Sequence, residues 1–238
     1  MGIFAGGKAA RASGGTVSTA GPYTVHQFTS TSTFTPAVTG FVDILLVGGG
    51  GNSGMPAPTG PTGWSGGGGG GATLFKKMIA VTAGTPYPIT LGPSTPTTFT
   101  YSGITTTAFH GAAGGSGGGG AGVSSSFASG GGGGRASTGG TAPSVYGIGY
   151  PGGSTGDPAT GCAGGGAGGA GGNYPGTLER GAGVPITYFT GVSPDIVGQG
   201  GRNGPAYDGP GGYGAGGSSP AALTVGPGQP GVAYIRYM

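Results

Sequence analysis

Runs of glycine constrain this chain more than any other feature. Gly fills 68 of the 238 positions and Pro another 20, and many glycines lie in runs such as Gly48–Gly51, Gly66–Gly71, Gly117–Gly120 and Gly130–Gly134. A helix interior loses about 1 kcal/mol for each Gly and about 3 kcal/mol for each Pro relative to Ala. The runs therefore predict almost no α-helix. Gly does not recur at every third position, so a collagen triple helix is excluded.

Two kinds of structure are open to a glycine run. A single run is typical of a flexible linker. The alternative is an extended helix with three residues per turn, here called polyglycine II, whose backbone N–H and C=O groups point outwards in three directions. Buried groups of this kind need partners, and Gly lets neighbouring backbones come close enough to supply them. Because the runs return many times, we expect a bundle of polyglycine II helices.

Segments rich in β-branched and aromatic residues lie towards the two ends of the chain and predict strands. Both alternating sets of side chains in Phe41–Val47 are largely apolar, which indicates a central strand covered on both faces. Val232–Tyr237 is expected to have one wetter face, and Lys76 and Lys77 are typical of an edge strand. The predicted strands are Tyr23–Phe28, Ser32–Thr35, Phe41–Val47, Thr73–Val81, Tyr87–Leu91, Thr97–Tyr101, Thr105–His110 and Val232–Tyr237.

The chain is poorly supplied with chemically reactive side chains. Charged residues make up 5% of the sequence and the net charge is +3 without a basic cluster, which argues against nucleic-acid binding. His26, His110 and Cys162 are too few for a four-ligand zinc site. The G-x-S-x-G patterns around Ser116 and Ser154 lack the flanking strand and helix of a nucleophile elbow. We therefore expect no enzyme activity and no catalytic, cofactor-binding or metal-binding residues.

The sequence also bears on where the protein is made. Its single Cys excludes an internal disulfide, which fits synthesis in a reducing cytoplasm. The first fifteen residues lack the apolar region of a signal peptide, and the run FVDILLV is far shorter than the roughly 20 residues that span a bilayer. We expect neither conventional secretion nor membrane insertion.

Several segments together resemble a known family. They are FTSTSTFTPAVTGFVDILLVGGGG, then GGGGGGATLFKKMIAVTAGTPYPITLG, then many glycine blocks and a closing GPGQPGVAYIRYM. This order resembles the glycine-rich domain of bacteriophage tail and tail-fibre proteins, and is similar to the glycine-rich region of anaplastic-lymphoma-kinase-type receptors. The receptors' cysteines, kinase and membrane span are missing here, as are a fibre shaft and coiled coil. The resemblance implies a fold and a setting, with no catalytic residues.

The resemblance and the strand pattern together predict an all-β fold. We expect a small jelly-roll-like β-sandwich with an inserted bundle of polyglycine II helices and almost no α-helix. Residues 23–110 and 221–238 would form the sandwich, and residues 111–220 the bundle. Residues 1–22 would form an N-terminal arm that anchors the protein to another chain. Its expected contacts are Ile3, Phe4, Lys8 and Arg11.

Aromatic residues outside the strands lie in the Pro- and Gly-rich segments that would connect glycine helices. Some would cap the bundle. Others would lie in exposed loops, where Tyr beside Ser, Gly and Asn is typical of recognition. The candidate receptor contacts are Tyr146, Tyr150, Tyr174 and Tyr207; the other aromatics of this kind are Trp64, Tyr188, Phe189 and Tyr213.

These inferences predict a non-enzymatic structural protein of a bacteriophage virion, tail- or fibre-associated, that presents loops for host attachment. It would be made in the host cytoplasm and exposed extracellularly on the virion. Expected partners are other virion proteins, a host surface receptor and further copies of the chain in a homo-oligomer or multicopy assembly. Two alternatives stay open: a capsid decoration or head-fibre protein, and a non-phage extracellular filament or surface-layer subunit.

Overall fold

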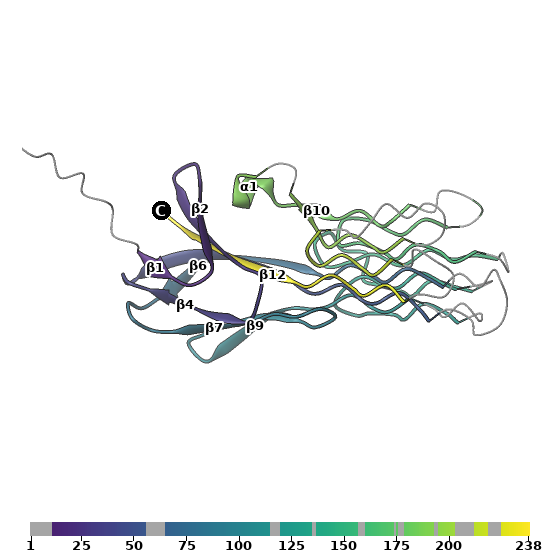
Figure 1. The fold of residues 1–238 in the computed structure, drawn as a ribbon, viewed down its shortest axis with the longest axis horizontal. Helices are drawn as coiled ribbons and strands as arrows, with labels where there is room; N and C mark the ends of the chain where they lie inside the picture. The colour runs from purple at the N-terminus through teal and green to yellow at the C-terminus, as the bar shows by residue number, and fades with distance from the viewer. Residues whose placement is uncertain are drawn as a thin grey trace, which may run out of the picture.

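Two regions lie in line along the long axis of the molecule, a β-sandwich at one end and a glycine bundle at the other (Figure 1). The structure is a computed structural model, and the ranges that it describes are 11–55, 65–114, 120–134, 137–156, 160–173, 175, 179–192, 195–202, 212–218 and 225–238. Long β-strands of the sandwich continue directly into the tracts of the bundle, so the two regions share several chain segments.

The sandwich consists of two five-stranded antiparallel sheets. The first has the order β1-β4-β7-β8-β9, from β1 (Ala12–Ser13), β4 (Ser32–Pro36), β7 (Tyr87–Thr90), β8 (Thr97–Tyr101) and β9 (Ile104–Ala108). The second has the order β2-β3-β12-β5-β6, from β2 (Thr16–Ala20), β3 (Tyr23–Phe28), β12 (Val232–Tyr237), β5 (Gly40–Val47) and β6 (Thr73–Val81). Since β12 lies between β3 and β5, the two ends of the chain close one domain. The predicted all-β sandwich is confirmed.

Apolar side chains from both sheets form the main core. Phe34 and Phe99 of the first sheet pack with Ile44, Leu46 and Ile235 of the second, all fully buried. The strands alternate as predicted, with these residues on the inner face. Burial of this apolar area is the main stabilising contribution in the sandwich.

The outer face of the second sheet is also covered. A segment that leaves the bundle and returns to it lies over this face, with β10 (Val184–Pro185), the single-turn helix α1 (Thr187–Thr190) and β11 (Ile196–Val197). Its Ile186 and Phe189 pack against residues of β3, β5 and β12. The prediction that β5 is covered on both faces is therefore confirmed. The wetter face expected for β12 is wrong, because Val232–Arg236 is buried throughout.

The glycine bundle is held by backbone hydrogen bonds that repeat every three residues. In the tract from Gly66 to Ala72, residues three apart donate to the same neighbouring tract, as expected for three residues per turn. The donor pairs and their acceptors are Gly67 and Gly70 to Cys162 and Gly165, Gly68 and Gly71 to Gly217 and Gly214, and Gly69 and Ala72 to Ala112 and Phe109, at 2.7–3.0 Å.

The same tract accepts hydrogen bonds from further neighbours. The carbonyls of Gly66, Gly69 and Ala72 accept from one tract, whose donors are Gly54, Gly51 and Gly48. Gly130–Gly134 repeats this threefold pattern with neighbours of its own. The predicted polyglycine II bundle is thus present. A flexible linker is the wrong interpretation for the glycine runs that the structure describes.

Glycine is required here because the tracts leave no room for a side chain. A Cβ on Gly68 would overlap the carbonyl group of Gly51, and a Cβ on Gly111 would overlap that of Gly69. By contrast, nothing lies within 4 Å of the Cβ position of Gly156. Close backbone contact is therefore a property of the packed tracts and not of every glycine.

The predicted region boundaries need correction. The bundle is not confined to residues 111–220, because the tracts 48–54, 65–72 and 225–231 also belong to it. Residues 12–20 are not part of a separate arm either: β1 pairs with β4, and β2 pairs with β3. Thr16–Ala20 holds little apolar surface, and the sequence therefore predicts an arm there, but strand pairing through the backbone does not require apolar side chains. The edge position expected for Lys76 and Lys77 is confirmed in β6.

Candidate functional site

The predicted receptor-contact tyrosines do not all gather at one place among the described residues. Tyr146 lies in the short turn between Val145 and Gly149, and 59% of it is exposed. Tyr150 is half-buried, and its carbonyl accepts a hydrogen bond from Gly130 inside the bundle. Tyr174 and Tyr207 lie outside the residues that the structure describes, as does Trp64. Of the four, Tyr146 has the clearest exposed aromatic surface.

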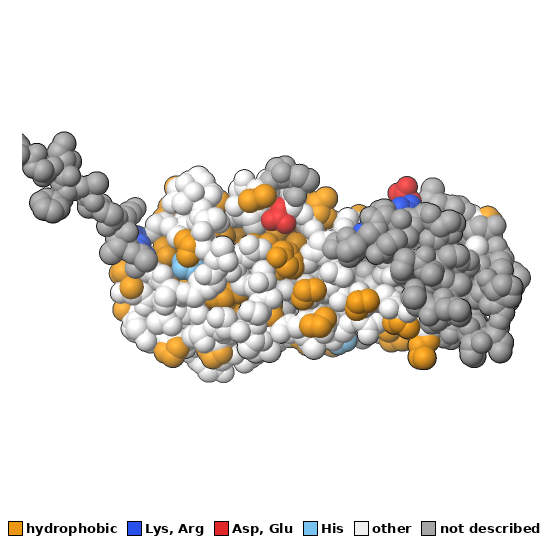
Figure 2. Space-filling view, viewed as in Figure 1, with side chains coloured by type: hydrophobic (Ala, Val, Ile, Leu, Met, Phe, Trp, Pro, Cys, Tyr) orange, Lys and Arg blue, Asp and Glu red, His pale blue; other side chains and the backbone are white. Residues whose placement is uncertain are grey.

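Exposed aromatic residues lie in two pairs where the bundle meets the sandwich, Tyr146 with Tyr188 and Phe109 with Phe127. The residue after Tyr146, Gly147, accepts hydrogen bonds from the amide and the hydroxyl of Thr73 at the start of β6. The carbonyl of Phe109 accepts from Ala72, one residue earlier. We call Phe109, Phe127, Tyr146 and Tyr188 the junction aromatics. Figure 2 shows hydrophobic side chains spread over this middle part of the molecule, with few charged side chains.

Two of the junction aromatics were missed by sequence reasoning. Phe109 and Phe127 stack with ring centroids 4.7 Å apart, although 59% of Phe127 is exposed. Phe109 was assigned to a predicted strand, and Phe127 follows a serine run, so neither carried a separate signal. A stacked pair that remains exposed is a ready apolar platform for another ring or an apolar ligand.

Tyr188 is held from below by the sandwich. Its ring packs edge-on to Phe75 with centroids 6.2 Å apart, and its carbonyl accepts a hydrogen bond of 3.0 Å from Arg236. Partial burial raises the pKa of the Tyr188 hydroxyl above its ordinary value, against the opposing effect of the Arg236 charge. The hydroxyl is therefore neutral near pH 7 and can both donate and accept a hydrogen bond.

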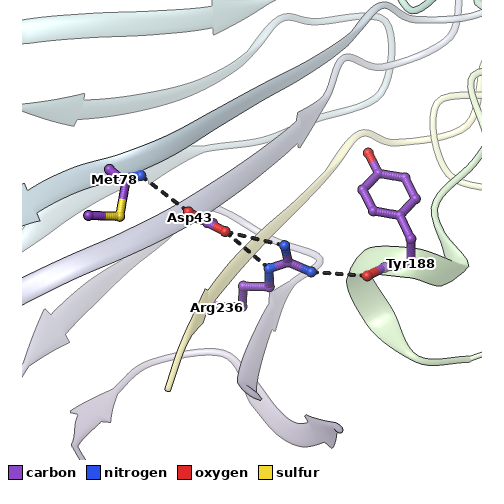
Figure 3. Close-up of polar contacts among 4 residues, drawn as sticks. All are labelled: Asp43, Met78, Tyr188 and Arg236. Carbon is purple, nitrogen blue, oxygen red and sulfur yellow. Dashed lines mark hydrogen bonds and ion pairs between the residues drawn. The ribbon is translucent and has the colours of Figure 1, made fainter. Parts of the chain in front are cut away.

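Arg236 of β12 links β5, through Asp43, with α1, through the carbonyl of Tyr188 (Figure 3). Its guanidinium pairs with the Asp43 carboxylate at 3.2 Å and lies 4.4 Å from the Tyr23 ring centroid and 4.3 Å from that of Phe189. Asp43 also accepts a 3.1 Å hydrogen bond from the Met78 amide at a bulge in the pairing of β5 with β6. These contacts satisfy both charges, so the pair positions α1 and carries no free reactive group.

A hollow of about 400 Å³ lies at the sandwich end, where the described chain begins. Exposed Val38, Phe41 and Met78 line it, and Arg11 on its wall donates a 2.7 Å hydrogen bond to the carbonyl of Met238. Arg11 is the member of the predicted arm contacts that the structure describes. Ile3, Phe4 and Lys8 lie outside the described residues.

The side chains considered for catalysis or metal binding take part in the packing and hydrogen bonding of the fold where the structure describes them. His26 is buried between Phe28, Phe34 and Tyr237, while Cys162 is buried in the bundle. The Ser154 hydroxyl accepts a hydrogen bond from the Gly139 amide, so it caps a tract. Ser116 lies outside the described residues. Within the described ranges, no group of three or more His, Cys, Asp or Glu side chains could hold a metal ion.

Comparison with protein families places the chain in one of them. A family model described as a glycine-rich domain matches residues 24–238. The chain therefore belongs to the glycine-rich domain family, and the match spans both the sandwich and the bundle. No curated protein matches the chain. Among the described residues, no helix is long and apolar enough to cross a membrane.

Proposed function

We propose that this protein is a non-enzymatic structural component of a bacteriophage virion, tail- or fibre-associated, that presents aromatic side chains for host attachment. The observation that carries the proposal is the position of the junction aromatics on a rigid scaffold. Phe127, Tyr146 and Tyr188 are each 59% exposed, yet the backbone beside them is held by the bundle and by Arg236. Rigid exposed aromatics bind at low entropic cost.

The setting is supported by the resemblance to phage tail and tail-fibre domains, together with the scarcity of charge and of reactive groups. The protein would be made in the host cytoplasm and act on the outside of the virion. The N-terminal residues Ile3, Phe4, Lys8 and Arg11 would bind another virion protein at the sandwich end, which leaves the bundle pointing away from the attachment point. Deleting residues 2–10 should then release the protein from the virion while the purified domain stays folded.

Adsorption measurements test the recognition role. The double variant Tyr146→Ala, Tyr188→Ala should slow phage adsorption to its host by about tenfold or more, since buried interface aromatics often contribute 2 kcal/mol or more. Its melting temperature should change little. Ile104→Ala is the matched control, because it removes a large exposed side chain at the opposite end of β9 from Phe109. Equal adsorption by both variants would contradict the recognition role.

Immunogold labelling of intact virions tests the location. Label on the tail or fibres supports the proposal, whereas label on the head favours a capsid decoration or head-fibre protein. Absence of the protein from purified virions would favour a filament or surface-layer subunit instead.

A further inference from the structure

Strand β2 is the least covered strand of the sandwich. Thr16–Thr19 is exposed at every residue, and Val17 has 56% of its surface exposed. β2 pairs with β3 on one side and forms the edge of its sheet on the other. Figure 1 shows the hairpin of β2 and β3 projecting beyond the body of the sandwich. Among the described residues, no hydrogen bond from a loop or another element engages the backbone groups on its open edge, and Gly191 after α1 lies against Ala20 at the turn end of the strand.

The opposite edge of the same sheet, strand β6, is protected against pairing with another strand. β6 carries Lys76 and Lys77, and it has a bulge at Met78, whose φ of 57° departs from a regular strand. Charges and bulges are the usual means of blocking edge pairing. β2 has neither feature, nor a Pro. Edge β9 of the other sheet is also uncharged, but its Thr106 and Ala108 are buried.

The register of β2 makes it self-complementary. Ala20 pairs with Tyr23 across the two-residue turn Gly21–Pro22, so alternation along the ladder leaves the N–H and C=O groups of Val17 and Thr19 facing outwards. In an antiparallel pair centred on Ser18, Val17 of one copy lies opposite Thr19 of the other. Each such pair can exchange two hydrogen bonds. No like charges meet, because the strand has none.

We propose that two copies of this chain associate through antiparallel pairing of β2 with β2, which joins two five-stranded sheets across a twofold axis at Ser18. An extended strand is the partner that fits, because the open groups are backbone donors and acceptors in a row. A second copy supplies that strand in matching register. The inference stands independently of the virion role, which concerns the junction and the N-terminal residues.

Sedimentation equilibrium of the full chain tests the pairing. The wild type should show a concentration-dependent dimer. Thr19→Pro removes one outward N–H per copy without touching the bonds to β3, so it should raise the dimer dissociation constant by about tenfold or more. Thr105→Pro is the matched control on β9, where the same alternation directs the N–H outwards. It should leave the dimer intact.

Cross-linking gives a second readout that does not depend on a proline. In a Cys162→Ala background, Ser18→Cys should form a disulfide-linked dimer on oxidation, because directly opposite residues have Cα atoms about 4.5–5.5 Å apart. Thr105→Cys should remain monomeric. A wild type that stays monomeric at every accessible concentration, with no cross-link through Ser18→Cys, would overturn the proposal. So would an equal loss of dimer in the Thr19→Pro and Thr105→Pro variants.

Discussion

The sandwich and the bundle are stabilised by opposite means. In the sandwich, apolar side chains such as Phe34, Ile44 and Phe99 fill the space between two sheets. In the bundle, neighbouring backbones bond to each other directly, and the Cβ positions of Gly68 and Gly111 are already occupied by carbonyl groups. The sandwich should therefore be most sensitive to removal of atoms, and the bundle to their addition. This difference can be tested region by region.

The largest effect should come from a deletion in the sandwich core. Phe99→Ala removes a fully buried ring that stacks with Tyr87 at 5.9 Å, and it should destabilise the protein by about 3–5 kcal/mol. Chemical denaturation measures the loss. Exposed Phe41→Ala should cost far less, and equal losses for the two variants would contradict a packed core.

The next largest effect should come from one added methyl group in the bundle. Gly69→Ala places a Cβ against the carbonyl of Ser129, so it should cost about 3 kcal/mol, the upper end for overpacking. For a chain of this length that lowers the melting temperature by roughly 6–12 °C.

Gly156→Ala is the control for this substitution, because the space around Gly156 is open. It should be neutral by calorimetry. If Gly69→Ala is neutral as well, the backbone-packed description of the bundle is wrong.

A smaller loss is expected where Arg236 holds α1 on the sandwich. Arg236→Met leaves the Asp43 carboxylate without its ion-pair partner and removes the hydrogen bond to the Tyr188 carbonyl. The expected loss of stability is about 2 kcal/mol, a value between those of exposed and of fully buried ion pairs. Hydrogen exchange should show the loss first in residues 184–197. Adding Asp43→Asn should recover part of it, and a strictly additive double variant would show that the two side chains do not interact.

The smallest effect should be a pH dependence confined to the sandwich. Burial lowers the pKa of His26, although its hydrogen bond to the Gly14 carbonyl opposes this. The folded state thus favours the neutral ring. The resulting contribution of His26 to the free energy of unfolding is complete above the ordinary histidine pKa of about 6.5. Stability should fall as the pH drops below that value towards the lowered pKa.

Thermal melts across this pH range check the His26 prediction. His26→Gln should flatten the profile. Hydrogen exchange should increase near β2 and β3 and not in the tract 66–72. An unchanged profile in His26→Gln would assign the effect to other groups.

Local patterns predicted much of the fold. The ends of Thr73–Val81, Thr97–Tyr101 and Val232–Tyr237 agree with the structure residue for residue, because apolar and β-branched residues begin and end there. β2 was missed because an edge strand exposed on both faces has no alternation of apolar and polar residues. Its pairing depends on backbone groups, which look alike in every sequence.

The candidate site was harder to predict for a related reason. Asp43 and Arg236 are 193 positions apart, and their pairing follows from the register of β5 with β12. Tyr146 could be chosen as a candidate contact from the composition of the surrounding segment. Its position beside Tyr188, however, depends on the packing of Ile186 and Phe189 on the sandwich. Contacts of this kind arise from the tertiary arrangement and leave no local signal.

The packed tracts also limit how such a protein can evolve. Any amino-acid replacement at a Gly codon introduces a side chain, and at Gly68 or Gly111 that side chain would meet a neighbouring backbone. Most point mutations in the tracts should therefore destabilise the fold, and selection should remove them. Residues that carry side chains into solvent, such as Tyr146 and Phe127, face no such restriction. Lineages of this fold should accordingly diverge by substitution in the connecting segments and by gain or loss of whole tracts, while the tract interiors stay glycine.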